Sequence, residues 1–385
     1  MENLDKILSE YVAVGDNTAN RLLGAAFIVC NKDGVLYQGA AGRIDIAPDS
    51  PVFSVDTWTW AASMAKIVTM TGVMALVEKG SVGLDDDMRT IVPELGRLQI
   101  LRGFTDETPI LEDNTEPITL RHLLTHGAGI GTDIADPELM KWSQAVGRTA
   151  TCLDYTLEGW SVPMKFPPGE GWYYGGATEF AGVALERITG MKLSEYMSEH
   201  VFKPLGMEDT TFYRESMAIK VADRTSPCTM RDPETGALSA MPWIIPADPE
   251  LLSLGSGLYM TASDHAKKST VDEMFRPQLS DSQRAVLKRV TDTFHDAMVP
   301  EFPPGMPLDH GISGIINLED TPGKRRKGSM MWQGMANGHW WIDRESGIAA
   351  TLFVSVLPQG DAVVTELYDE LERAVYKDLL PSNGA

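Results

Sequence analysis

A serine and a lysine three residues apart, Ser63 and Lys66, lie in the apolar stretch WAASMAKIVTM at positions 60–70. Residues three apart share one face of a helix, so the two side chains can touch if a helix begins near Ala61. Burial among apolar groups disfavours the ammonium form of a lysine, and a neutral amine can accept a hydroxyl proton. Unpaired amides in a first helical turn favour negative charge on the serine oxygen. The pair therefore predicts an activated, nucleophilic serine.

Two further stretches carry residue types that fit the same chemistry. PPGEGWYYGG, at 167–176, leads from turn-forming residues to Tyr173 and Tyr174, and a phenol held at such a turn can relay a proton. MWQGMANGHWWID, at 331–343, contains Gly334, which would let a substrate approach the backbone closely. Each stretch alone is also typical of packing, and Ser-x-x-Lys arises by chance about once in such a chain. A lysine that reaches solvent from a half-buried helix is the alternative for Lys66.

Helical and strand patterns show which elements must position these residues. The apolar runs around Asp33-Gly34, and the runs NGHWWID and IAATLFVSVL around the turn RESG, each predict a β-hairpin. Residues 61–79 form a long apolar pattern that ends at Gly80, which predicts the helix that carries Ser63 and Lys66.

The strand patterns lie toward the two ends of the chain, whereas helical patterns and Pro/Gly-rich loops fill the middle. We therefore expect an α/β domain built from residues 1–84 and 251–385, with a mainly helical region at 85–250 inserted. The active site is expected at the interface between them.

Together the three stretches resemble the serine β-lactamase and penicillin-binding-protein superfamily, which has a Ser-x-x-Lys signature. LRHLLTHGAGI, FKPLGMEDTTF and GSGLYMTASDHAK match further family passages, so the resemblance runs from about residue 20 to 375. WQGMANGHWWIDRESG is similar to the class C-type esterase branch, and within it to fungal acyltransferases and hydrolases of polyketide metabolism. The resemblance implies an α/β, β-lactamase-like fold, in which helices flank an antiparallel sheet and a large, mainly helical insertion is present.

The resemblance also implies a role for each matching residue. Ser63 matches the nucleophile that forms an acyl-enzyme, and Lys66 matches the lysine that deprotonates it. Tyr174 matches the tyrosine that shares this proton and passes it to the leaving group, with Tyr173 as the neighbouring option. The backbone N–H of Met335 would join the N–H of Ser63 in the oxyanion hole.

Two positions depart from the lactamase pattern. Gly176 replaces the asparagine that grips the side-chain amide of a lactam. Trp332, followed by Gln333 and Gly334, replaces the lysine of Lys-Thr-Gly that pairs with the carboxylate of an antibiotic. These differences argue against β-lactamase or transpeptidase activity and for a less polar substrate. Four aromatic residues are candidates to line an apolar cleft: Trp172, Tyr173, Trp332 and Trp340.

The expected activity is acyl transfer from an ester or thioester, with a secondary metabolite as the substrate class. Water as acceptor makes the enzyme an esterase, and an alcohol or amine makes it an acyltransferase. A relative that only binds a ligand, or a true β-lactamase or D-peptidase, is the alternative. The closest approach to a Gly-x-Ser-x-Gly nucleophile motif is HGISGI at 310–315, where Ile315 breaks the pattern. His122 and His126 have zinc-ligand spacing but lack the accompanying glutamate, so no metal or cofactor is expected.

The composition restricts the partners and the compartment. The net charge is −21, which disfavours nucleic acid and anionic membranes as partners. The chain has no run of eighteen apolar residues, no apolar signal-peptide core near its start, and three cysteines without metal-ligand spacing. These features predict a cytoplasmic protein. KRRK, at 324–327, is interpreted as a solvated loop, with an acidic acyl carrier protein as a less favoured partner for it.

Overall fold

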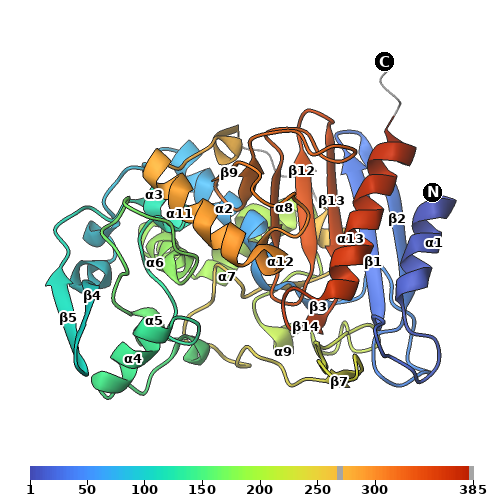
Figure 1. Ribbon diagram of the computed structural model, residues 1–385, viewed down its shortest axis with the longest axis horizontal. Helices are drawn as coiled ribbons and strands as arrows, with labels where there is room; N and C mark the ends of the chain where they lie inside the picture. The colour runs from blue at the N-terminus through green and yellow to red at the C-terminus, as the bar shows by residue number, and fades with distance from the viewer. Residues whose placement is uncertain (267–271, 381–385) are drawn as a thin grey trace.

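The computed structural model describes residues 1–266 and 272–380, and its central element is a seven-stranded sheet (Figure 1). The strand order is β2-β1-β13-β12-β11-β10-β9, and the neighbours pair antiparallel. The strands are β1 (Gly24–Asn31), β2 (Gly34–Gly42), β9 (Leu308–His310), β10 (Ile315–Asn317), β11 (Met330–Gln333), β12 (His339–Asp343) and β13 (Ile348–Phe353). Both predicted hairpins are present, and the N-terminal hairpin joins the C-terminal strands where Ala26 lies opposite Phe353.

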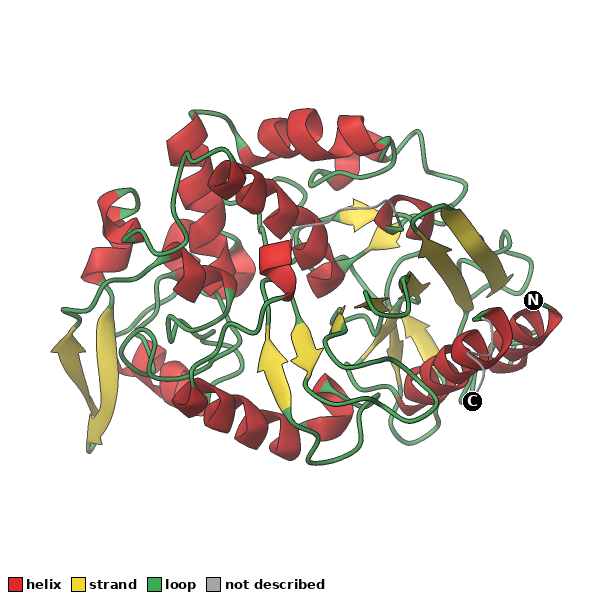
Figure 2. Cartoon of the chain, turned by 90° about the horizontal axis from the view of Figure 1, so that it is seen from above, coloured by secondary structure: helices red, strands yellow, loops and turns green. Residues whose placement is uncertain are grey.

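Two helices from opposite ends of the chain, α1 (Glu2–Tyr11) and α13 (Ala362–Ala374), lie side by side against the sheet (Figure 2). Each helix buries its apolar positions, as its helical spacing predicts. Trp341 of β12 stacks on Phe27 of β1 and meets Tyr368 of α13 edge-on. The core on this side is therefore built from both termini.

The basic stretch KRRK differs from its interpretation as a solvated loop. Lys324 and Arg325 are buried beneath α13, where Arg325 Nε donates to Glu372 at 2.7 Å and Lys324 lies 3.4 Å from the same carboxyl. The interpretation is wrong for these two residues because a buried carboxylate from α13 compensates their charge. Arg326 and Lys327 are exposed.

Another group of helices carries the Ser-x-x-Lys stretch and packs beside the sheet. The apolar pattern at 61–79 was predicted as one helix, but it forms a 3₁₀ turn, η1 (Ala62–Ala65), followed by α2 (Lys66–Glu78). The turn and the helix join at Lys66, whose backbone N–H donates to Ser63 O. α10 (Ala262–His265) packs against β1 and β13 near this helix.

The middle of the chain is mainly helical, and its helices between residues 120 and 189 lie at the end of the molecule away from α1 and α13 (Figure 1). Its helices are η2 (Met88–Thr90), η3 (Pro93–Arg97), α3 (Leu120–Leu124), α4 (Pro137–Ala145), η4 (Cys152–Asp154), α5 (Leu157–Trp160), α6 (Ala177–Thr189), α7 (Leu193–Met197), the π-helical η5 (Ser198–Phe202), α8 (Lys203–Leu205) and α9 (Arg214–Met217). This arrangement matches the expected helical insertion, and the domain boundaries near residues 84 and 251 stay a prediction.

The remaining elements are short and join these parts. The strands are β3 (Thr59–Trp60), β4 (Gln99–Thr105), β5 (Thr108–Asp113), β6 (Thr229–Arg231), β7 (Leu238–Ala240), β8 (Tyr259–Met260) and β14 (Val356–Leu357). The helices are η6 (Asp272–Phe275), α11 (Asp281–Thr293), α12 (His295–Met298) and η7 (Val375–Leu379). Over the two described ranges, the helices are too short or too polar to cross a bilayer.

Candidate active site

Ser63 and Lys66 lie in contact at the junction of η1 and α2. Lys66 Nζ donates to Ser63 Oγ at 3.1 Å, as the three-residue spacing predicts. Lys66 is only 4% exposed, whereas Ser63 is partly exposed. The amine is therefore shielded from water while the hydroxyl beside it remains accessible.

Tyr174 completes a closed set of hydrogen bonds with this pair. Its hydroxyl donates to Ser63 Oγ at 2.6 Å and accepts from Lys66 Nζ at 2.8 Å. The loop that carries Tyr174 packs closely against the segment after α3. A Cβ on Gly175 would lie 2.5 Å from Ile130 O, so this close packing requires glycine. Ser63, Lys66 and Tyr174 thus share one proton network.

Tyr173 faces a different part of the molecule. Its hydroxyl donates to Asp136 Oδ2 at 2.7 Å, at the N-cap of α4. Burial and this carboxylate raise the pKa of Tyr173. Of the two neighbouring tyrosines, Tyr174 is therefore the one that reaches Ser63.

The end of β11 packs tightly against the segment that precedes Ser63. A Cβ on Gly334 would lie 2.8 Å from Ala61 O and 3.3 Å from Ala62 Cβ, so this approach requires glycine. Ala62 itself has φ 48°, a left-handed conformation that costs an alanine about 1–2 kcal/mol. The strained residue and the close contact both lie directly before Ser63. Met335, the residue after Gly334, is 44% exposed.

The other residues predicted on β11 point into the protein. Trp332 is buried, and its ring lies 5.0 Å from the ring of Tyr174. Gln333 is also buried and its side-chain amide donates to Ala297 O. Trp172 is buried as well and stacks against Tyr174. Their substrate-binding role stays a prediction.

Gly176 has no room for a side chain. A Cβ at this position would lie 2.7 Å from the ring of Trp160 in α5. The indole of Trp160 therefore occupies the space into which the lactamase asparagine would project. Nothing in the local sequence around Trp160 pointed to this neighbour of Gly176.

Two buried histidines lie behind Tyr174. The ring of His126 meets Tyr174 edge-on at 4.7 Å and lies 5.6 Å from the ring of His310. Burial lowers the pKa of His126 well below its usual value and that of His310 to about 4. Both rings are therefore neutral near pH 7. No pattern in the sequence indicated that His310 lies beside His126.

His122, the other histidine of the HLLTH stretch, has a structural role. Its Nδ1 accepts the backbone N–H of Thr119, and Thr119 caps α3 in return. Within residues 1–266 and 272–380, no group of three or more His, Cys, Asp or Glu side chains is arranged to hold a metal ion.

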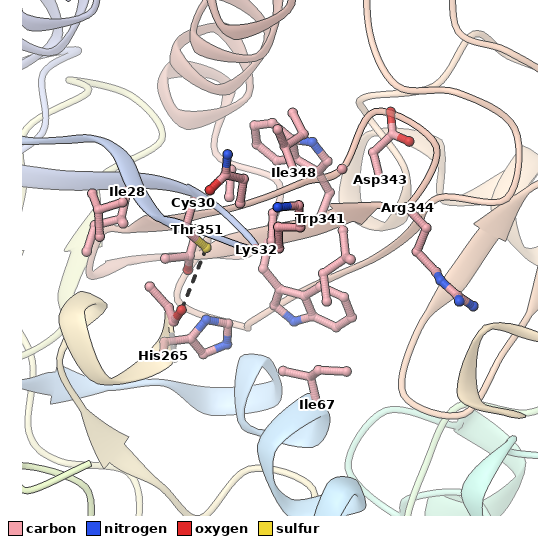
Figure 3. A pocket seen from close by; sticks show the side chains of 18 of the residues that line it. Ile28, Cys30, Lys32, Ile67, His265, Trp341, Asp343, Arg344, Ile348 and Thr351 are labelled. Carbon is pink, nitrogen blue, oxygen red and sulfur yellow. Dashed lines mark hydrogen bonds between the residues drawn. The ribbon is translucent and has the colours of Figure 1, made fainter. Parts of the chain in front are cut away.

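A cavity of about 630 Å³ lies beside α2, and Ser63 is not among its lining residues (Figure 3). Ile67 comes from α2, whereas Cys30 and Thr351 come from the sheet. Trp340, a predicted candidate for an apolar cleft at the active site, lines this cavity.

Comparisons with known proteins agree with this geometry. The family model described as Beta-lactamase matches residues 4–373. Lovastatin esterase from Penicillium rubens is 28% identical to this chain, and the match covers 91% of this chain and 94% of the esterase. Monacolin J acid methylbutanoyltransferase from Aspergillus terreus is 30% identical, with 87% of this chain and 85% of the transferase covered.

A solved structure of unliganded simvastatin synthase (LovD) from Aspergillus terreus superposes on the protein with a TM-score of 0.86. It is 26% identical, and the match covers 100% of this chain and 98% of the synthase. The predicted resemblance to fungal acyltransferases and hydrolases is confirmed by these matches.

Proposed function

Because this chain belongs to the β-lactamase family and is a serine acyl-transfer enzyme of that fold, we propose that Ser63 is its nucleophile and that Lys66 and Tyr174 move the proton. The closed hydrogen-bond set among these three side chains, with distances of 2.6, 2.8 and 3.1 Å, carries this proposal. The set places an amine and a phenol within hydrogen-bonding distance of Ser63 Oγ, the atom that must lose its proton when it attacks the substrate.

The reaction proceeds through an acyl-enzyme. Lys66 Nζ takes the proton of Ser63 as Oγ attacks the carbonyl carbon of the substrate. The proton then passes through Tyr174 to the leaving group, which departs and leaves the acyl group on Ser63. The acceptor, water or an alcohol or amine, then attacks the acyl carbon and loses its proton to the same pair of side chains. The bond between the acyl carbon and Ser63 Oγ breaks, and the proton returns to Oγ, so that the serine is free again.

The backbone N–H groups of Ser63 and Met335 are the proposed oxyanion donors. The close approach between Gly334 and the segment Ala61–Ala62 supports this assignment, because it holds the end of β11 beside the nucleophile. One such donor is typically worth about two to three powers of ten in rate.

The substrate is proposed to be an apolar small-molecule ester or thioester of secondary metabolism. In β-lactamases, two positions carry residues that bind polar groups of the lactam. In this chain the first is Gly176, against which the Trp160 ring packs, and the second is the buried Trp332. A core cluster that contains Ala62 and Ala336, the neighbours of Ser63 and Met335, is bordered by partly buried apolar side chains. These are Met217, Met230, Met241, Trp243 and Ile244.

The names of the relatives, an esterase and a methylbutanoyltransferase, support the same chemistry on small molecules. An acyl carrier protein as donor has less support, because Lys324 and Arg325 are buried and only Arg326 and Lys327 of the basic stretch are exposed. We further propose a cytoplasmic location. Its support is that Cys152 and Cys228 are buried thiols, and burial raises the pKa of Cys152 to about 12.

Intact-protein mass spectrometry after incubation with candidate esters and thioesters tests the proposal. The expected result is a mass increase equal to one acyl group in the wild type and no increase in Ser63→Ala. Fluorophosphonate labelling is the second measurement. A folded wild type that takes neither acyl group nor label would show a ligand-binding protein, and rapid turnover of nitrocefin would show a β-lactamase.

A further inference from the structure

A buried carboxyl group, that of Glu179, lies close to Lys66. Glu179, in the first turn of α6, is 4% exposed. Its Oε1 accepts from Ser253 Oγ at 3.0 Å and from the backbone N–H of Gly255 at 3.3 Å. Its Oε2 has no hydrogen-bond partner among the described residues. A carboxyl buried in this way is costly unless a charge nearby offsets the loss of water.

Lys66 lies close to this carboxyl, beside the same glycine. Lys66 Nζ donates to Gly255 O at 2.8 Å. A Cβ on Gly255 would lie 2.7 Å from Glu179 Oε1 and 3.1 Å from Lys66 Nζ. Because Gly255 has no side chain, the carboxyl of Glu179 and the amine of Lys66 can both lie against this residue.

The other titratable groups around this pair do not supply a second negative charge. His126 and His310 face Lys66, and burial keeps both rings neutral near pH 7. The hydroxyl of Tyr174 is a hydrogen-bond donor to Ser63 Oγ. Tyr155 lies near Glu179, and burial raises its pKa, which keeps its phenol protonated. Burial also raises the pKa of Glu179, while the nearby Lys66 acts to lower it.

We propose that Glu179 is a positioning residue that holds the segment Ser253–Gly255 against Lys66 and whose carboxylate stabilises the Lys66 ammonium during acylation of Ser63. This inference rests on the proposed function. The O–H bond of Ser63 breaks, an N–H bond forms on Lys66, and Oγ bonds to the carbonyl carbon. The proton then leaves through Tyr174 as the bond to the leaving group breaks. Glu179 exchanges no proton in this sequence.

The test compares the pH dependence of Ser63 labelling by a fluorophosphonate in the wild type and in Glu179→Gln. Glutamine keeps an acceptor oxygen for Ser253 and Gly255 but carries no charge. Without the carboxylate the Lys66 ammonium is less favoured, so the acid limb of the profile should move to lower pH by about one unit or more. The plateau rate should fall about tenfold, because the ammonium formed on acylation is less stabilised.

Two further variants separate charge from position. Ser253→Ala removes one hydrogen bond to Glu179 and keeps the carboxylate, so the labelling rate should fall while the acid limb stays in place. Glu179→Asp keeps the charge and should keep the acid limb near that of the wild type. Thermal unfolding of each variant is measured in parallel, because a purely structural role would lower the melting temperature without moving the acid limb.

The outcomes distinguish this inference from the proposed function. A labelled wild type with a Glu179→Gln profile that superposes on it, or that moves to higher pH, overturns the role of Glu179 alone. A shifted acid limb in Ser253→Ala also contradicts it. A wild type that takes no label at any pH, like Ser63→Ala, overturns the proposed function and this inference with it.

Discussion

Tyr173 and Tyr174 are neighbours in the chain, yet their hydroxyl groups bind different parts of the protein. Tyr174 donates to Ser63 Oγ at 2.6 Å, and Tyr173 donates to Asp136 at 2.7 Å. One tyrosine joins the proton network and the other ties the loop to the start of α4. The pair thus provides its own control for the role of the phenol.

The first prediction uses this pair. Tyr174→Phe should lower kcat/KM for an activated ester by about 10²–10⁴, because a phenyl ring keeps the packing but cannot relay a proton. Tyr173→Phe should stay within about threefold of the wild type and lose about 1 kcal/mol of stability with its hydrogen bond. Steady-state kinetics and urea denaturation measure both. The reverse ranking of activities would assign the relay to Tyr173.

The second prediction concerns the nucleophile and its base. Ser63→Ala should abolish acyl-enzyme formation, and Lys66→Ala should reduce it nearly as far, because each removes one end of the proton transfer. Ser63→Ala should keep the circular dichroism spectrum of the wild type, because the smaller side chain leaves the η1 turn intact. Acylation by a Lys66→Ala variant at the wild-type rate would show that Lys66 is not the base.

The third prediction separates the backbone of Met335 from its side chain. Gly334→Ala should lower the acylation rate by about 10²–10³, because its Cβ would force the end of β11 away from Ala61 O and move a proposed oxyanion donor. Met335→Ala keeps the N–H and should change the rate by no more than a few fold. Equal losses in the two variants would instead make the Met335 side chain the important group.

The fourth prediction tests the packing of Gly176 on Trp160. Gly176→Asn should destabilise the protein by about 1–3 kcal/mol, because the new Cβ would meet the ring at 2.7 Å. Gly96→Asn is the matched control, since a Cβ on exposed Gly96 would meet only Arg89 atoms at 3.9 Å. Chemical denaturation compares the two. Similar losses of stability in the two variants would show that the Trp160 ring can move to accommodate the new side chain.

The fifth prediction is a pH dependence of stability from the buried histidine behind Tyr174. The pKa of His310 falls to about 4 in the folded protein, from about 6.5 in an unfolded chain. Between these values the unfolded state binds the extra proton, so the free energy of unfolding should fall as the pH drops from 6.5 to 4. The contribution is about 3 kcal/mol. His310→Phe should make the profile less steep in that window, while His126, whose pKa is also lowered by burial, keeps part of the slope. An unchanged slope would show that His310 does not contribute.

Several features of the site were predictable because their signals are local. The contact between Ser63 and Lys66 follows from their spacing and apolar surroundings. Tyr174 was assigned through the resemblance of its turn to a family motif, because the turn alone left Tyr173 and simple packing as alternatives. His310, Glu179 and Trp160 could not be predicted, because each reaches its neighbour from a distant segment that has no motif of its own. The burial of Arg325 depends likewise on Glu372, which lies 47 positions further along the chain.

The pairing of β1 with β13 has a consequence for how the protein is made. Ala26 must find Phe353, and the turn that holds Ser63 must find Gly334, so both contacts close very long loops. Non-local contacts of this kind slow folding, because the loop-closure entropy is lost before the contacts form. During translation, Ser63 and Lys66 are consequently synthesised long before Gly334 and the end of β11, which pack beside them in the folded protein. The enzyme should gain its activity only after the strands β11 and β13 have been synthesised.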